Sequence, residues 1–158
     1  MATQDSQRTA TASDALEALD ELVATSILGQ QEFARNLGLS TTDLICFAHV
    51  LASRDAAVTA GDLAARAHVT TGAVTGILNR LERGGFVTRE PDPADRRRVR
   101  VVPVPAAAER VRAVYGPYHA LLAQSFSRYT PEETAVIADW LARAATLART
   151  YLDESCAT

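Results

Sequence analysis

The chain has 158 residues, enough for one domain or for a small domain joined to helical arms. Hydrophobic residues make up 47% of the chain but aromatic residues only 6%, so its core must consist mainly of small aliphatic side chains. Such side chains bury little area each, and a partner subunit could be needed to complete the core. No apolar run is long enough to span a bilayer, and residues 2–12 lack the apolar segment of a signal peptide. We therefore expect a cytoplasmic protein without membrane contact.

The positive charge is concentrated in one stretch. The formal net charge is −3, which argues against a nonspecific polyanion binder. Between Leu63 and Arg100, however, eight Arg face four acidic residues, a local balance of +4, whereas the remainder has a balance of −7. The two cysteines, Cys46 and Cys156, are far apart and lack CxxC spacing, so we expect no disulfide framework, no metal site and no cofactor.

The N-terminal part is predicted to be helical. Residues 1–12 are polar and show no periodicity, which indicates a disordered tail. Ser13 is a candidate N-cap for an amphipathic helix of about six turns that ends near Gly38. Ser40-Thr41-Thr42-Asp43 has the spacing of a capping box and opens a second helix, apolar on several sides, that runs through Ala52.

The next segment has the pattern of a helix-turn-helix. Residues 56–59 fit a short strand, and a capping box at its end opens a short helix over residues 63–67. After a tight turn, Thr70 or Thr71 caps another helix that runs to Arg83 and stops at two glycines. Two short helices joined by such a turn are typical of the helix-turn-helix motif.

The second helix of this pair has an outer face suited to a DNA major groove. Its first turns carry small or hydrogen-bonding residues, which let the backbone approach bases and phosphates. Later positions offer an amide and two guanidinium groups. The candidate DNA-binding residues are Thr70, Thr71, Gly72, Ala73, Thr75, Gly76, Asn79, Arg80 and Arg83. The alternative is a winged-helix protein-interaction module whose outer face is merely solvated.

A β-hairpin follows, with strands predicted over residues 86–90 and 98–102 around a Pro-bracketed turn. Its tip carries Asp95, Arg96, Arg97 and Arg98. An Arg at a hairpin tip can enter an A·T-rich minor groove, where the potential is most negative, and a neighbouring Asp can orient the guanidinium. The alternative is a surface ion-pair cluster that contributes little energy.

Two further helices complete the chain. Pro105 is well placed in the first turn of a helix that Gly116-Pro117 should kink. Thr130-Pro131-Glu132-Glu133 combines a capping box with proline at N1 and opens the last helix, and residues 153–158 are expected to fray. The predicted fold class is therefore mainly α with a small β-hairpin wing.

Three further sequence segments are informative: Val74-Thr75, residues 81–89 (LERGGFVTR) and residues 92–97 (DPADRR). They resemble the multiple-antibiotic-resistance regulator (MarR) family of bacterial transcription factors, and the resemblance extends over about residues 13–152. It implies a homodimer formed by N- and C-terminal helices (13–39 and 105–152), with a winged helix-turn-helix lobe (40–104) that binds a pseudo-palindromic operator, usually as a repressor. In this family Arg97 would enter the minor groove with Asp95 orienting it.

The resemblance also implies a ligand cleft between the dimer helices and the DNA-binding lobe, often for a small aromatic or organic anion. Phe47, His49 and Tyr118 are candidate lining residues. Two positions depart from the family pattern: Gly76 stands where relatives often have Arg, and Val102-Pro103-Val104-Pro105 replaces the usual end of the second strand. A cysteine-based redox sensor is an alternative mode of regulation, with Cys46 as its candidate residue. No arrangement of residues for an enzyme is present.

Overall fold

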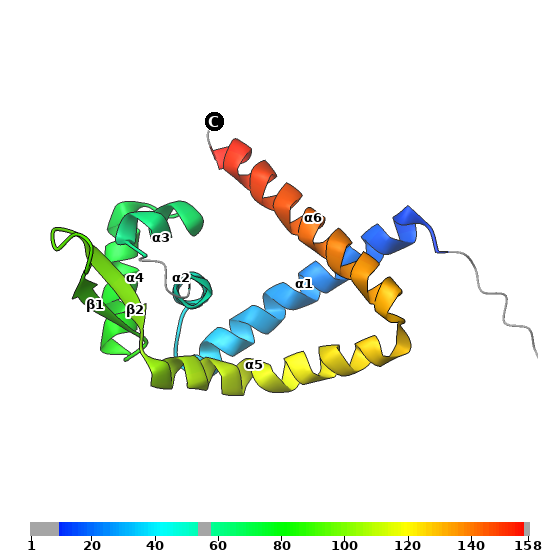
Figure 1. Cartoon of the computed structure of the whole chain (residues 1–158), viewed down its shortest axis with the longest axis horizontal. Helices are drawn as coiled ribbons and strands as arrows, with labels where there is room; N and C mark the ends of the chain where they lie inside the picture. Colours follow the sequence, from blue (N-terminus) through cyan, green and yellow to red (C-terminus); the bar gives the residue numbers. More distant parts are fainter. Residues whose placement is uncertain (1–9, 54–57, 157–158) are drawn as a thin grey trace, which may run out of the picture.

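The computed structural model describes residues 10–53 and 58–156. They form a mainly helical fold with one small β-hairpin, which confirms the predicted class (Figure 1). The elements in chain order are α1 (Ala12–Leu37), α2 (Thr41–Ala52), α3 (Ala60–Arg66), α4 (Thr71–Arg83), β1 (Val87–Pro91), β2 (Val99–Pro103), α5 (Pro105–Ser125), the 3-10 turn η1 (Phe126–Arg128) and α6 (Pro131–Cys156).

Capping residues set most helix starts. The Ser40 side chain accepts from the backbone N–H of Asp43, and the Asp43 carboxylate accepts from the backbone N–H of Ser40, as the capping box predicts. Helix α1, in contrast, starts at Ala12 and not after Ser13, because Thr11 forms a complete capping box with Asp14. The tail expected over residues 1–12 was therefore too long, because Thr11 caps the helix and Ala12 is its first residue. Residues 1–9 lie outside the described ranges.

Two other expectations need correction. Helix α6 continues to Cys156, four residues beyond the expected end at 152, because no glycine or proline interrupts it. Helix α3 begins at Ala60, directly after its cap, and not at residue 63. Pro117 lies inside helix α5, which is helical on both sides of it, and the kink expected there stays a prediction. Of the strand expected over residues 56–59, residues 58 and 59 lie in the described ranges. Val58 forms an isolated bridge with Val101, and Thr59 caps α3.

Helices α2, α3 and α4 and the β-hairpin form a lobe around one core (Figure 1). Phe47 of α2 packs edge-on against Phe86, which follows α4, with ring centroids 5.3 Å apart. Leu63, Val74 and other aliphatic side chains fill the remaining space and are fully buried. The hairpin is attached to this core by Val87 of β1 and Val101 of β2, which are both buried in it. In the register of the hairpin, Arg89 pairs with Val101. The lobe therefore holds helix α4 and the hairpin in a fixed relation.

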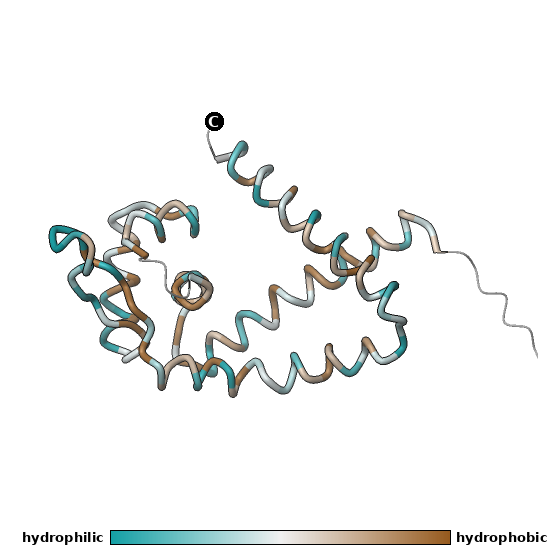
Figure 2. The backbone as a smooth tube through the Cα atoms, in the orientation of Figure 1, coloured by the Kyte–Doolittle hydropathy of each residue, from teal (hydrophilic) through white to brown (hydrophobic). Residues whose placement is uncertain are grey.

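The long helices α1 and α5 extend away from the lobe, and α6 runs back toward it from the far end of α5 (Figure 1). Brown, apolar segments recur along α1 and α6 in Figure 2, yet none of residues 131–155 is buried in the single chain. Large apolar side chains that remain exposed on these helices include Leu16, Ile27, Leu28, Leu121, Val136, Leu147 and Tyr151. No helix among the described residues is long and apolar enough to cross a membrane.

Candidate nucleic-acid interface

Helix α4 presents its N-terminal turns to solvent. The Thr70 side chain caps the helix by accepting from the backbone N–H of Ala73, at 3.2 Å. Thr71, Gly72, Ala73 and Thr75 are exposed, whereas Val74, Ile77, Leu78 and Leu81 on the opposite side are buried. A Cβ added to Gly72 would meet nothing within 4 Å. The packing of the described residues therefore does not require a glycine at this position.

Helix α4 is held at its start by an unusual turn. His68 adopts a left-handed backbone conformation with φ of 50°, which only a few per cent of non-glycine residues do. This conformation closes the turn, because the backbone N–H of Val69 then donates to the Ala64 carbonyl at 3.1 Å. The Nε2 atom of His68 also lies 3.7 Å from the Asp153 carboxylate of α6.

The wing tip is ordered by its backbone. The backbone N–H of Asp92 donates to the Arg98 carbonyl, and the carboxylate of Asp92, which is buried, accepts from the backbone N–H of Ala94. The carboxylate of Asp95 accepts from the backbone N–H of Arg97 at 3.0 Å. Asp95 therefore shapes the turn, where we expected it to hold the Arg97 guanidinium. The side chains of Arg96 and Arg97 are exposed and form no hydrogen bond or ion pair with the part of the chain that the structure describes.

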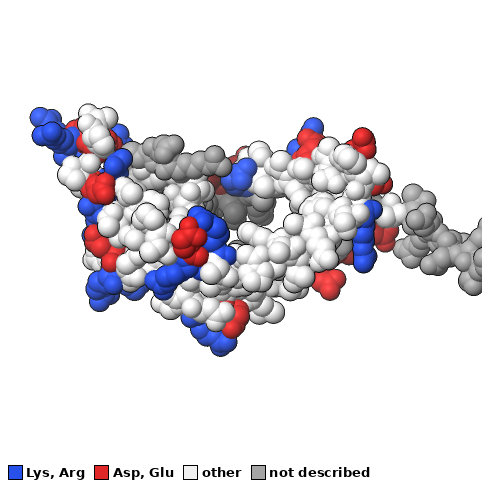
Figure 3. Space-filling model, turned by 60° about the horizontal axis from the view of Figure 1, so that its bottom comes forward, with Lys and Arg blue, Asp and Glu red and all other residues white. Residues whose placement is uncertain are grey.

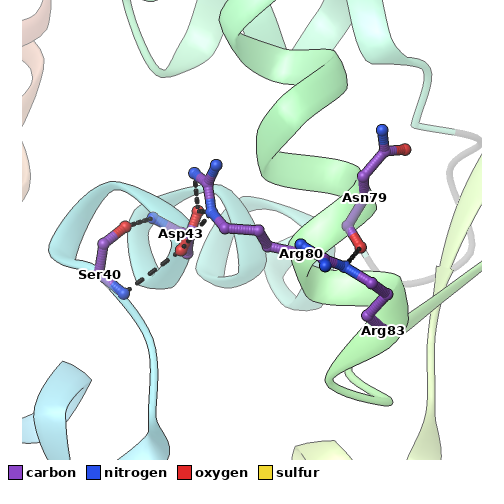
Figure 4. A network of polar contacts seen from close by, with 5 residues as sticks. All are labelled: Ser40, Asp43, Asn79, Arg80 and Arg83. Carbon is purple, nitrogen blue, oxygen red and sulfur yellow. Dashed lines mark hydrogen bonds and ion pairs between the residues drawn. The ribbon is translucent and has the colours of Figure 1, made fainter.

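Arg80 is directed into the lobe. Its Nη2 atom lies 2.6 Å from Oδ1 of Asp43, and its Nε atom lies 3.1 Å from Oδ2, so the pair is bidentate (Figure 4). Burial would raise the pKa of Asp43, but hydrogen bonds from Arg80 and Ser40 outweigh it and hold that pKa below its usual value. The same pair raises the pKa of Arg80. Sequence reasoning missed this contact because 37 positions separate the two residues.

The remaining polar residues of α4 form a second set of contacts. The Nε atom of Arg83 donates to the backbone carbonyl of Asn79, and the Nη2 atom of Arg89 donates to the side-chain oxygen of Asn79 at 2.8 Å. Arg89 also lies 3.3 Å from Glu82. In the space-filling view, most blue side chains lie over the lobe, whereas the long helices show mainly uncharged surface (Figure 3). The structure thus gathers basic side chains on the lobe.

Comparisons with known proteins agree with this geometry. Residues 37–98 match the family model described as the MarR family. The helix-turn-helix (HTH)-type transcriptional regulator YcgE of Bacillus subtilis is 34% identical over 139 residues, which cover 88% of this chain and 89% of that protein. The chain belongs to the MarR family. The B. subtilis regulator YkoM is 38% identical over 72 residues, which cover 45% of this chain and 46% of that protein.

Solved MarR-family structures share the fold. A MepR mutant from a multidrug-resistant S. aureus clinical isolate has a TM-score of 0.71 at 16% identity, and the match covers 84% of this chain and 96% of that chain. The S. aureus MepR–DNA complex has a TM-score of 0.58 at 16% identity, over 87% of this chain and 96% of that chain. A MarR crystal structure has a TM-score of 0.57 at 24% identity, over 85% and 98%.

A cavity of about 560 Å³ separates the lobe of this MarR-family protein from its long helices. Phe47 and Leu51 of α2 line one side, and Val111, Arg112 and Tyr115 of α5 line the other. The volume is within the range of small-molecule sites. A smaller cavity of about 250 Å³ shares Tyr115 and is lined also by Phe33 and Tyr118, whose rings lie 6.2 Å apart.

The residues predicted to line a ligand cleft are not all found in one cavity. Phe47 lines the larger cavity and Tyr118 the smaller one, whereas His49 lines neither. Burial lowers the pKa of His49, and the charge of Arg66 adds to that effect. His119 reaches the larger cavity instead, one helical position beyond Tyr118. Among the described residues, no group of three or more His, Cys, Asp or Glu could hold a metal ion.

Proposed function

We propose that this MarR-family regulator is a dimeric, ligand-responsive repressor that acts in the cytoplasm and binds a pseudo-palindromic operator. The observation that carries the proposal is the exposure, on one lobe, of a low-bulk helix start and of two wing-tip arginines, Arg96 and Arg97, that pair with none of the described residues. A helix and a wing so placed can meet a duplex in a major groove and in the adjacent minor groove. MepR, which has this fold, has been crystallised with DNA.

Each part of the lobe has a distinct proposed role. Backbone N–H groups at the start of α4 bind a phosphate, and the outer face of the helix lies along base edges. Arg97 enters the minor groove, with Arg96 and Arg98 near phosphates. The proposed DNA-contacting residues are Thr70, Thr71, Gly72, Ala73, Thr75, Gly76, Asn79, Arg83, Arg96, Arg97 and Arg98. Arg80 and Asp95 support this surface from within, through Asp43 and through the wing-tip backbone.

A second copy of the chain is the proposed cover for the long helices. The exposed fraction reaches 71% for both Leu147 and Tyr151 of α6, and Leu28 of α1 is 67% exposed. Burying a side chain of this size contributes about 1.5–3 kcal/mol, so several of them are sufficient to hold a dimer. A two-fold dimer would place two copies of α4, the proposed recognition helix, on two half-sites, which is why the operator should be pseudo-palindromic.

The larger cavity is the proposed effector site. Its rings and aliphatic side chains favour a small aromatic molecule, and the guanidinium of Arg112 together with His119 favours an anionic group on it. S. aureus MepR has been solved with ethidium bromide bound. An effector that binds better to a dimer with wrongly spaced recognition helices would release DNA, typically with a coupling of about 1–3 kcal/mol.

The experiment that tests this function is a gel-shift titration on DNA from upstream of the protein's own gene, repeated at several salt concentrations. We expect a clear preference over random DNA and an affinity that falls steeply with salt, since arginine contacts release counterions. A transcription assay from the same DNA should then show repression. Equal binding to both DNAs, or none, would favour the rival function, a winged-helix module that binds another protein.

A further inference from the structure

A contact between the wing and helix α4 sets the orientation of the side-chain amide of Asn79 in α4. Nη2 of Arg89 in β1 donates to the side-chain oxygen of Asn79, at 2.8 Å. A guanidinium has donors only, so the atom of the amide that faces it must be the oxygen and not the nitrogen. The amide nitrogen of Asn79 is consequently turned away from Arg89. In Figure 4 the nitrogen of Asn79 points away from the side on which the strands lie.

Arg89 is itself held in place. It lies in the middle of β1, where its backbone pairs with Val101, and its side chain is only 29% exposed. Its Nη1 atom lies 3.3 Å from Glu82, one turn further along α4. Two contacts to the same helix therefore fix the guanidinium, and a charge-assisted bond of this kind is about twice as strong as a neutral one. The orientation of the Asn79 amide is set before any DNA is bound.

Asn79 lies on the outer face of α4. Thr71, Thr75, Asn79 and Arg83 follow one another at four-residue steps and are all exposed. The Thr75 hydroxyl donates to the Thr71 carbonyl, at 3.2 Å, so its oxygen is left to accept. At Asn79 the reverse holds, because its oxygen is turned toward Arg89 and accepts from it, whereas its two side-chain N–H groups donate to nothing in the described part of the chain. The face therefore offers an acceptor at Thr75 and donors at Asn79.

We propose that Asn79 and Arg89 form a specificity-determining pair that selects a keto base, guanine or thymine, at one position of each half-site. In the major groove guanine O6 and thymine O4 are acceptors that can receive an amide N–H, whereas cytosine and adenine present an amino group at that place. The usual bidentate pairing of Asn with adenine needs the amide oxygen to face the base, whereas here it is turned toward Arg89 and already uses one of its two lone pairs. Arg89 is the positioning residue and Asn79 the contacting residue. The proposal rests on the function proposed above.

The test is a selection of the full-length protein on an operator library randomised through the half-site, at fixed salt. The wild type should enrich guanine or thymine at one position by about tenfold. Asn79→Asp keeps the partner of Arg89 but exposes only an acceptor, so the preference at that same position should change to cytosine or adenine. Arg89→Met frees the amide, and discrimination there should fall toward none while the other positions keep theirs. Arg83→Met is the control, and it should weaken binding to all sequences alike.

Several outcomes would overturn the proposal. Arg89→Met or Asn79→Asp with the wild-type preference at every position would refute it, even if operator binding itself is confirmed. A uniform loss across all sequences for Asn79→Asp would make Asn79 a phosphate contact and would refute it as well. If Arg89→Met does not fold, as its circular dichroism would show, Asn79→Asp alone decides. A wild type with no sequence preference would refute the proposed function, and this inference with it.

Discussion

Arg80, on the helix that faces outward from the lobe, is bound through two nitrogens to the buried carboxylate of Asp43 in α2. The same helix α2 lines the larger cavity through Phe47 and Leu51. A displacement of α2 by an effector would therefore act directly on α4 through this ion pair. We expect the pair also to contribute to the stability of the lobe.

Replacing Asp43 by Asn should lower the free energy of unfolding at pH 7 by about 1–3 kcal/mol, the range for weakening a buried charged hydrogen bond. Urea denaturation followed by circular dichroism measures it. Asp62→Asn is the matched control. Asp62 occupies the same capping-box position in α3, but no bidentate ion pair joins its carboxylate to an arginine of the described chain. We expect a smaller loss for the control, and equal losses would contradict a special role for the pair.

The stability difference between the wild type and Asp43→Asn should depend on pH. The pKa of Asp43 in the folded chain is lower than in the unfolded chain, so its contribution to stability is present above the unfolded value of about 3.9 and is lost as pH falls through the folded value. The difference in unfolding free energy between wild type and Asp43→Asn should consequently be constant near neutrality and shrink below about pH 4. A difference that stays constant into acid would show that Asp43 is not preferentially ionised in the folded state.

Replacing Arg97 by Ala should weaken operator binding by about 1–3 kcal/mol without changing the oligomeric state. The loss should be greater on an operator with A·T pairs under the wing than on one with G·C pairs there, because the narrow groove attracts the guanidinium. Fluorescence anisotropy at matched salt measures both. Arg149→Ala, on exposed α6, is the control and should bind as wild type does. Unchanged binding by the Arg97 variant would remove the wing tip from the mechanism.

Replacing Leu147 by Asp tests the dimer. In an isolated chain this side chain is 71% exposed, so a monomer would tolerate the change. In a dimer it would remove apolar burial twice, at about 1.5 kcal/mol or more each, and raise the dissociation constant at least about a hundredfold. Sedimentation velocity measures the shift. Ala65→Asp is the control: it adds the same charge on the exposed side of α3, outside the long helices that form the proposed dimer surface, and should leave the dimer intact. A wild type that sediments as a folded monomer would end the dimer proposal.

Replacing Ala48 by Phe should fill the larger cavity. Ala48 lines that cavity and is exposed to it, so the ring has space without repacking the core. The variant should bind operator normally but lose its response to a panel of small aromatic carboxylates, which we expect to release DNA from the wild type. Ala52→Phe is the control, since Ala52 is exposed on the same helix but lies outside the lining. Release from both variants alike would place the effector elsewhere.

Peroxide treatment tests the redox alternative. Cys46 is fully buried, and burial raises the pKa of its thiol, with the nearby Asp43 charge adding to that effect. A protonated, inaccessible thiol reacts slowly, so we expect peroxide to leave operator affinity unchanged. The Cys46→Ala variant should behave identically. A peroxide response in the wild type that disappears in Cys46→Ala would establish redox sensing at this residue.

Local sequence signals predicted the recognition helix and wing well. Thr70, the two glycines after Arg83 and the Pro-Asp turn fix element ends over a few residues, so a single sequence suffices to find them. The contacts that orient these elements were not predictable. Asp43 and Arg80, or Arg89 and Asn79, come together only when separate elements pack, and each residue alone reads as an ordinary capping or surface residue. The extension of α6 past residue 152 was also missed, since no stop signal is present to mark its end.

The position of the core along the chain has a consequence for synthesis on the ribosome. Among the described residues, every buried hydrophobic side chain lies between Ala34 and Ala107. All of the buried hydrophobic residues are therefore synthesised before α6. At about 5–20 residues per second, the 49 residues from position 108 to Cys156, the last residue of α6, add roughly 2–10 s. In the proposed dimer the apolar side chains of α1 stay uncovered during that interval, which is therefore the time at which a nascent-chain chaperone would matter most.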